Sequence, residues 1–206
     1  SSAASDVYKR QEYDESPDTT HFSVIDSEGN AVSNTYTLGS SFGSGVTITK
    51  GGFLMNNQMR NFSHFYGRDD MKYGTSEANK LEPGKRMIST QTPTLVFNPN
   101  GDLFMILGSP GGGRIPNIIT QVISNVIDHE MSFTEAVIAP RINQRLEGNL
   151  QLETGFSPDT VSLLIDRGHE VENSNTMGSV QAIFLDQGKI FGVADTRRPG
   201  ALAKGN

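Results

Sequence analysis

The chain has 206 residues, of which 35% are hydrophobic, and it carries a net charge of −6 with no cysteine. This length suits one compact domain, and scattered basic residues in an acidic chain argue against a nucleic-acid or anionic-membrane surface. The lack of cysteine excludes disulfides, thiolate nucleophiles and cysteine-bound metals, and no apolar run is long enough to span a membrane.

The first 18 residues are polar and aperiodic, which predicts a flexible tail followed by one folded domain over residues 19–206. Strand-like runs then occur in pairs around short turn segments, a pattern typical of β-hairpins. Three hairpins are expected, and they join 21–26 to 31–37, 93–97 to 103–107, and 180–185 to 190–194. The strands should therefore form antiparallel sheet.

The middle of the chain changes to a helical period. Apolar residues recur three or four positions apart over 115–127 and predict a helix with one apolar face that packs on a sheet. Ser132 with Glu135 forms a capping box for a short second helix, and Ser157 begins a third. The residues expected to face inward from the third helix are Val161, Leu164 and Ile165. Strands on both sides of a helical middle predict a layered α+β domain.

Residues 62–86 show no periodic pattern and contain several aromatic and charged side chains. This segment is either a mobile loop over a site or a plain surface loop.

The histidines do not form a known catalytic or metal-binding spacing. They are His21, His64, His129 and His169. Metal-dependent hydrolysis and a serine triad are therefore disfavoured, and no metal is expected.

A glycine run at 108–113, with the sequence GSPGGG, lies between a predicted strand and the strongest predicted helix. Consecutive backbone N–H groups at a helix N-terminus favour a negative charge, which indicates an oxyanion hole or anion-binding nest. A phosphate loop is disfavoured because the motif G-x-x-x-x-G-K-[ST] is absent. A tight structural turn remains the alternative.

Six sequence blocks occur in one order along the chain. They are TTHFSVIDSEGNAVSNTYTL, FGSG, FLMNNQM, KRMISTQTPT, GSPGGGRI and VADTRRPG. Together they resemble the small, C-terminal subunit of the γ-glutamyltranspeptidases, which are N-terminal-nucleophile (Ntn) hydrolases. The resemblance covers residues 19–206 and implies an Ntn-hydrolase αββα sandwich of two stacked antiparallel sheets flanked by helices, completed by a large subunit that is absent here.

The resemblance also implies a nucleophile and a maturation step. The precursor would be cut by its own threonine between Asp18 and Thr19, and Thr19 would then form the acyl-enzyme. A threonine hydroxyl needs an adjacent base, and a freed α-amino group with a pKa near neutrality can serve on the same residue. Thr20 is the alternative nucleophile if the cut falls one residue later.

The remaining roles are carried over position by position. Thr37 resembles the threonine that orients the nucleophile, and Gly111 and Gly112 resemble the oxyanion donors. The substrate-binding positions implied by the resemblance are Gln58, Asn61, Ser89 and Thr90.

Two positions depart from the family pattern. Asn61 stands where the family usually has an aspartate that pairs with the substrate's α-ammonium group, and Gly39 replaces a residue that is often polar. The expected activity is transfer or hydrolysis of γ-glutamyl groups from glutathione-like amides. The alternatives are a glutaryl acylase of the cephalosporin type, and an inactive homologue whose first 18 residues are never removed.

The resemblance implies no cofactor and predicts a heterodimer with a large N-terminal subunit from the same precursor. The acyl acceptor would be an amine, a peptide or water. A periplasmic or extracellular location is expected, with an export signal outside this chain.

Overall fold

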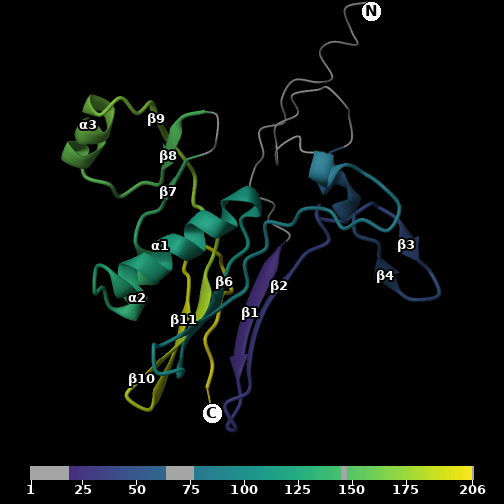
Figure 1. Cartoon of the computed structure of the whole chain (residues 1–206), viewed down its shortest axis with the longest axis horizontal. Coiled ribbons are helices and arrows are strands. Elements are labelled where there is room, and N and C mark those ends of the chain that lie inside the picture. The colour runs from purple at the N-terminus through teal and green to yellow at the C-terminus, as the bar shows by residue number, and fades with distance from the viewer. Residues whose placement is uncertain (1–18, 64–76, 145–147, 206) are drawn as a thin grey trace, which may run out of the picture.

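The computed structural model describes residues 19–63, 77–144 and 148–205 (Figure 1). The predicted tail, which includes Asp18, lies outside these residues. So does the middle of the predicted 62–86 loop.

A four-stranded antiparallel sheet with the order β11-β10-β6-β5 forms the centre of the described structure. Its strands are β5 (Thr94–Phe97), β6 (Leu103–Gly108), β10 (Gln181–Asp186) and β11 (Lys189–Ala194). β5 pairs with β6 and β10 with β11, which confirms two of the predicted hairpins. β6 and β10 join the hairpins, with Gln181 opposite Gly108.

Helix α1 (Ile115–Ile127) packs on one face of this sheet, as its apolar period predicts (Figure 1). Proline in its first turn suits the helix start, because a backbone N–H there has no partner within the helix. The side chains of α1 and the sheet form the main core. Its buried members from these elements include Met105, Leu107, Ile115, Ile118, Ile119, Val122 and Phe184.

The first hairpin, β1 (Thr20–Ile25) with β2 (Ala31–Tyr36), packs on the opposite face of the sheet. Its polar side chains face inward, because the hydroxyl of Ser23 donates to the carbonyl of Gln181 over 3.0 Å and that of Ser33 to Leu107 over 2.9 Å. Its apolar side chains face outward. Phe22, Val24, Val32 and Tyr36 are between 48% and 61% exposed.

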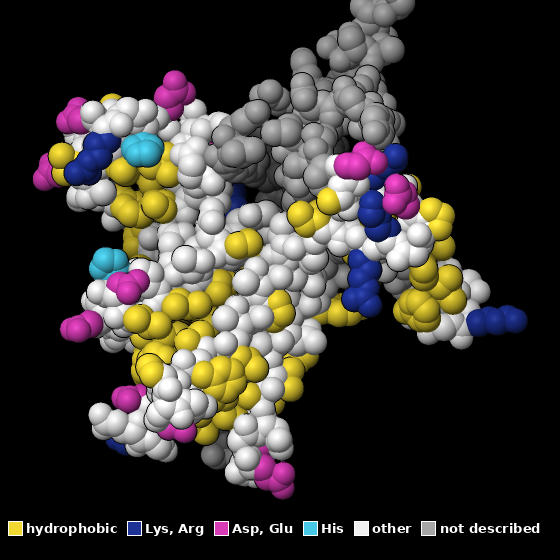
Figure 2. All heavy atoms as spheres, in the orientation of Figure 1, with side chains coloured by type: hydrophobic (Ala, Val, Ile, Leu, Met, Phe, Trp, Pro, Cys, Tyr) yellow, Lys and Arg dark blue, Asp and Glu magenta, His cyan; other side chains and the backbone are white. Residues whose placement is uncertain are grey.

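This orientation is the reverse of the usual one, in which a hairpin buries its apolar face. Figure 2 shows exposed hydrophobic side chains over the part of the molecule that holds the sheet and the hairpin. The described layers are therefore helix, sheet and hairpin. The predicted four-layer sandwich stays a prediction.

Shorter elements complete the described chain. They are β3 (Thr47–Ile48), β4 (Phe53–Leu54), β7 (Ile142–Asn143), β8 (Leu150–Leu152), β9 (Val171–Asn173), the 3₁₀ turns η1 (Gln58–Asn61), η2 (Glu77–Asn79) and η3 (Gly112–Arg114), and helices α2 (Phe133–Ile138) and α3 (Pro158–Asp166). The capping box of α2 is present as predicted. β8 and β9 form a parallel pair, which was not predicted from the sequence.

The inward face predicted for α3 is only partly present. Val161 and Leu164 are half-buried, but Ile165 is 54% exposed, so its assignment to an inward face was wrong. Among the described elements α3 packs chiefly against the short strand β9, and three residues of strand are too few to cover a broad helix face.

Candidate active site

The register of the first hairpin brings Thr19 and Thr37 together. Thr20 lies opposite Tyr36 in the antiparallel pair, so the residues just outside the two strands are neighbours. The Thr19 hydroxyl donates to Oγ1 of Thr37 over 3.0 Å, and Thr19 is only 5% exposed. The backbone N–H of Gly39 also donates to Oγ1 of Thr37, over 2.9 Å. The candidate nucleophile is thus buried, and the residue expected to orient it is itself held in place.

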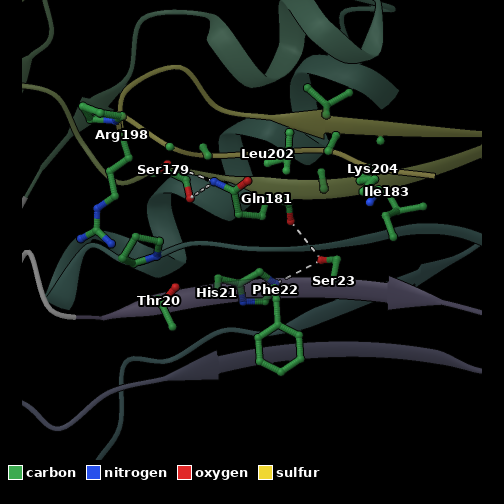
Figure 3. A pocket seen from close by; sticks show the side chains of 18 residues that line it. Thr20, His21, Phe22, Ser23, Ser179, Gln181, Ile183, Arg198, Leu202 and Lys204 are labelled. Atoms are coloured by element: carbon green, nitrogen blue, oxygen red, sulfur yellow. Dashed lines mark hydrogen bonds between the residues drawn. The ribbon is translucent and has the colours of Figure 1, made fainter. Parts of the chain in front are cut away.

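Thr20 has a different environment. It is exposed and lines a groove of about 530 Å³ between β1, β10 and the C-terminal segment (Figure 3). The contact with Thr37 therefore favours Thr19 over Thr20 as the nucleophile.

His21 follows in β1 and is buried beneath the hairpin, where its ring lies against Gly108. Nδ1 is 2.8 Å from the Thr35 hydroxyl, and Nε2 is 3.2 Å from the Ser23 hydroxyl. Burial lowers the pKa of His21 from 6.5 to about 4. His21 is therefore neutral at physiological pH and serves as a satisfied structural side chain.

The backbone carbonyl of Thr19 is held by a separate contact. Arg198, on the segment that follows β11, donates from Nη1 to the Thr19 carbonyl over 2.6 Å. The side chain of Arg198 extends from that segment toward the start of β1 in Figure 3. The stretch around Arg198 resembles a family block in sequence, but this contact was not predicted.

A buried ionic network anchors the segment before Arg198. Asp195 is fully buried and accepts from Nη2 of Arg141 over 2.7 Å and from Nη1 of Arg197 over 3.1 Å. Glu153 pairs with Nη2 of Arg197 over 2.6 Å. Burial acts to raise the pKa of Asp195, but Arg141 and the N–H groups of Val180 and Arg197 hold it below its usual value.

The sequence carried a signal for this network that was missed. Arg141 interrupts the apolar stretch AVIAPRI, and Asp195 directly follows the apolar end of β11. Charged residues inside apolar segments require buried partners of opposite charge.

The predicted oxyanion donors lie in the loop between β6 and α1. Gly111 has φ 143° and Gly112 has φ 55°, a backbone region that favours glycine. Gly112 begins η3, which leads directly into α1, so the loop meets the positive end of a helix. Pro110 lines the same groove as Thr20, which brings this loop and the start of β1 to one region.

The predicted substrate-binding residues are brought together in part. Thr37, Gln58 and Ser89 line a hollow of about 200 Å³ with Tyr36 and neighbouring residues. Asn61 reaches this hollow through Gln58, because its Nδ2 donates to Oε1 of Gln58 over 2.9 Å. Thr90 is half-buried and is not among the lining residues.

Gly39, the second departure from the family pattern, has a steric cause in this chain. Its φ is +96°, and a Cβ at this position would overlap the side-chain oxygen of Asn57. Asn57 accepts from the backbone of Ser40 over 3.1 Å and donates to the hydroxyl of Ser40 over 2.9 Å. A polar side chain at position 39 would therefore have to displace Asn57.

Within residues 19–63, 77–144 and 148–205, no group of three His, Asp or Glu side chains is placed to hold a metal ion. The helices of this described part are all too short or too polar to cross a bilayer.

The chain is similar in sequence to one protein family and to several of its relatives. A family model described as Gamma-glutamyltranspeptidase matches residues 1–205. The Glutathione hydrolase proenzyme of Escherichia coli (strain K12) is 42% identical over 195 residues, covering 93% of this chain and 33% of that protein. The Acylase ACY 1 proenzyme of Pseudomonas sp. (strain SE83) is 39% identical over 188 residues, covering 90% of this chain and 32% of that protein.

The chain is also similar in fold to a solved structure. A mutant of Helicobacter pylori gamma-glutamyltranspeptidase superimposes with a TM-score of 0.79 at 42% identity, covering 87% of this chain and 100% of that one. The chain itself spans about a third of the length of the curated relatives it matches.

Proposed function

We propose that this chain, which belongs to the gamma-glutamyltranspeptidase family, is the small subunit of a γ-glutamyl transferase or hydrolase whose precursor cuts itself between Asp18 and Thr19. Its fold is gamma-glutamyltranspeptidase-like, with antiparallel sheets and few helices. The observation that carries the proposal is the buried contact of 3.0 Å between the Thr19 and Thr37 hydroxyl groups. The hairpin register places the two residues side by side, and the hydrogen bond between their hydroxyls suits a nucleophile and the residue that orients it.

The proposed reaction proceeds through an ester on Thr19. Oγ1 attacks the acyl carbon of the donor amide while its proton passes to the freed α-amino group of the same residue. The resulting ammonium then returns a proton to the leaving amine as the C–N bond breaks. Water or an acceptor amine cleaves the ester in the second half-reaction and regenerates Thr19.

The N–H groups near Gly111 and Gly112 are proposed to stabilise the tetrahedral oxyanion. A pair of left-handed glycines at the start of α1 is suited to this role, because backbone donors are free of side-chain bulk there.

A large subunit from the same precursor is the proposed partner. The outward face of the β1–β2 hairpin supports this, because Phe22, Val24, Val32 and Tyr36 form an apolar surface that is about half exposed. Soluble proteins rarely leave such a face uncovered. The curated relatives are proenzymes about three times as long as this chain, so they hold ample sequence to cover it.

The acyl donor is proposed to be a γ-glutamyl amide such as glutathione, in line with the similarity to glutathione hydrolase proenzymes. A glutaryl donor is the second candidate, because Asn61 cannot form an ion pair with an α-ammonium group and an acylase proenzyme is 39% identical. The protein is proposed to be periplasmic or extracellular, and this proposal rests on the family resemblance.

Expression of the whole precursor tests this proposal. Mass spectrometry of the purified protein should find a new N-terminus at Thr19, and the mature protein should release aniline from a γ-glutamyl or glutaryl anilide. An uncut precursor with no turnover of either anilide would instead support the inactive alternative.

Asn61→Asp should raise kcat/KM for a γ-glutamyl anilide by about 10-fold to 100-fold, since a charge-assisted contact to an ammonium contributes about 1.5–3 kcal/mol. The position suits such a contact, because Asn61 is hydrogen-bonded to Gln58, which lines the hollow beside Thr37. The change removes the hydrogen bond of 3.4 Å from Nδ2 of Asn61 to the carbonyl of Ile88. Ile88 is exposed, so water can replace the lost donor.

The same change should not help a glutaryl anilide, which has no ammonium group. Asn98→Asp, on the exposed turn between β5 and β6, adds an equal charge away from the hollow and should alter neither donor. Equal effects of Asn61→Asp on the two donors would show that residue 61 does not contact the α-ammonium group of the donor.

A further inference from the structure

The C-terminal segment brings a cation, Arg198, to the candidate nucleophile Thr19. The reaction proposed above gives this cation no role. Nη1 of Arg198 donates to the Thr19 carbonyl over 2.6 Å. The two residues are 179 positions apart, so the fold and not the local sequence creates this contact. A carbonyl held by a charged donor is fixed more firmly than one held by a neutral donor.

The segment that carries Arg198 is rigidly attached to the core. The backbone N–H of Arg197 donates to Oδ1 of Asp195 over 3.0 Å, and Nε of Arg197 donates to Oε1 of Glu153 over 3.0 Å. Arg197 also donates to the carbonyl of Ala139 over 2.8 Å. Arg198 therefore extends to Thr19 from a fixed base.

We propose that Arg198 is a positioning residue for the nucleophile: its guanidinium holds the carbonyl of Thr19 and favours the neutral form of the α-amino group that maturation frees on that residue. This inference rests on the proposed function.

Covalent geometry limits the separation of the charge from the amine. The N and O atoms of one residue are at most about 3.6 Å apart, so Nη1 lies within about 6 Å of the Thr19 nitrogen. A cation at this distance disfavours protonation of the amine and so lowers the pKa of the amine. The decrease is about half a unit in a medium like water and about two units at the dielectric constant of a protein surface.

The other charged groups around Thr19 do not supply this effect. His21 in β1 is neutral at physiological pH, because burial lowers its pKa to about 4. Asp195 and Glu153 are paired with Arg141 and Arg197. A further cation, Lys204 in the C-terminal segment, lines the same groove as Arg198. Arg198 is a cation whose side chain donates directly to Thr19.

The test uses the large subunit co-expressed with a separate small subunit that begins at Thr19 after removal of its initiator methionine, so that no variant depends on self-cutting. The variants are Arg198→Gln, Arg198→Lys and the control Lys204→Gln, which removes a cation from the same groove. The pKa of the Thr19 amine is read from the pH dependence of its acetylation by acetic anhydride, followed by mass spectrometry of the N-terminal peptide. The acid limb of kcat/KM against pH is the second readout.

Arg198→Gln should move the acetylation midpoint up by about half a unit or more, and the acid limb of kcat/KM should move with it. Arg198→Lys should keep both midpoints near those of the wild type while lowering kcat, because the charge is retained and the fork that holds the carbonyl is lost. An unchanged acetylation midpoint in Arg198→Gln, or an equal shift in Lys204→Gln, would overturn the inference. Because acetylation needs no turnover, a protein inactive on every donor would refute the proposed function while still deciding the role of Arg198.

Discussion

Thr19→Ala in the whole precursor should leave the chain uncut and abolish acyl transfer. The change removes a buried hydroxyl that is hydrogen-bonded to Thr37, and an alanine at this position has no group that can attack the carbonyl of residue 18. Loss of a nucleophile typically removes several powers of ten from a rate. Gel electrophoresis and intact-mass measurement after prolonged incubation report the cut, and anilide turnover reports activity.

Thr20→Ala is the matched control, because it removes the neighbouring hydroxyl from an exposed position in the groove. This variant should be cut at the same peptide bond and should retain activity within about tenfold. A precursor that is still cut when residue 19 is alanine would contradict the assignment of the nucleophile, and failure of Thr20→Ala alone would transfer the role to Thr20.

Local patterns predicted the elements that position Thr19. Alternating apolar residues around a polar turn are enough to fix a hairpin, and the hairpin register alone places the residues before β1 and after β2 side by side. The long apolar period of α1 was equally clear. The glycine run was located between β6 and α1 because a strand pattern ends and a helical pattern begins there.

Features that depend on distant partners were not predicted. The pairing of Arg141 with Asp195 joins residues 54 positions apart, and local pattern indicates that each charge needs a buried partner without identifying that partner. β7, β8 and β9 are two or three residues long, which is too short for a period of two to be recognised.

The outward apolar face of the first hairpin was missed for a related reason. An alternating pattern tells which residues share a face, but it does not tell which face meets the core of this chain. Polar side chains of β1 and β2 are buried here because their hydroxyls find backbone carbonyls on the sheet. The apolar face is then left exposed in the described part of the chain.

The backbone at the glycine loop allows a test that separates catalysis from folding. Gly112 has φ +55°, and a Cβ added there meets no described atom within 4 Å, so a side chain at this position strains the backbone without a clash. Gly188, in the turn between β10 and β11, has φ +75° and equally open space. Valine at either position should therefore cost a similar amount, of about 1–3 kcal/mol in stability.

Gly112→Val should reduce kcat by about 100-fold to 1000-fold, whereas Gly188→Val should leave kcat nearly unchanged at a similar thermal midpoint. The difference is expected because valine disfavours the left-handed backbone at position 112 and turns the N–H groups of this loop away from the developing oxyanion, while the turn at position 188 touches no proposed catalytic group. Thermal unfolding of the two mature variants supplies the stability comparison, and steady-state kinetics on one donor supplies kcat. If Gly112→Val lost activity only in proportion to a lower thermal midpoint, or if Gly188→Val lost as much kcat, the loop would be a structural turn and the oxyanion would have to be stabilised elsewhere.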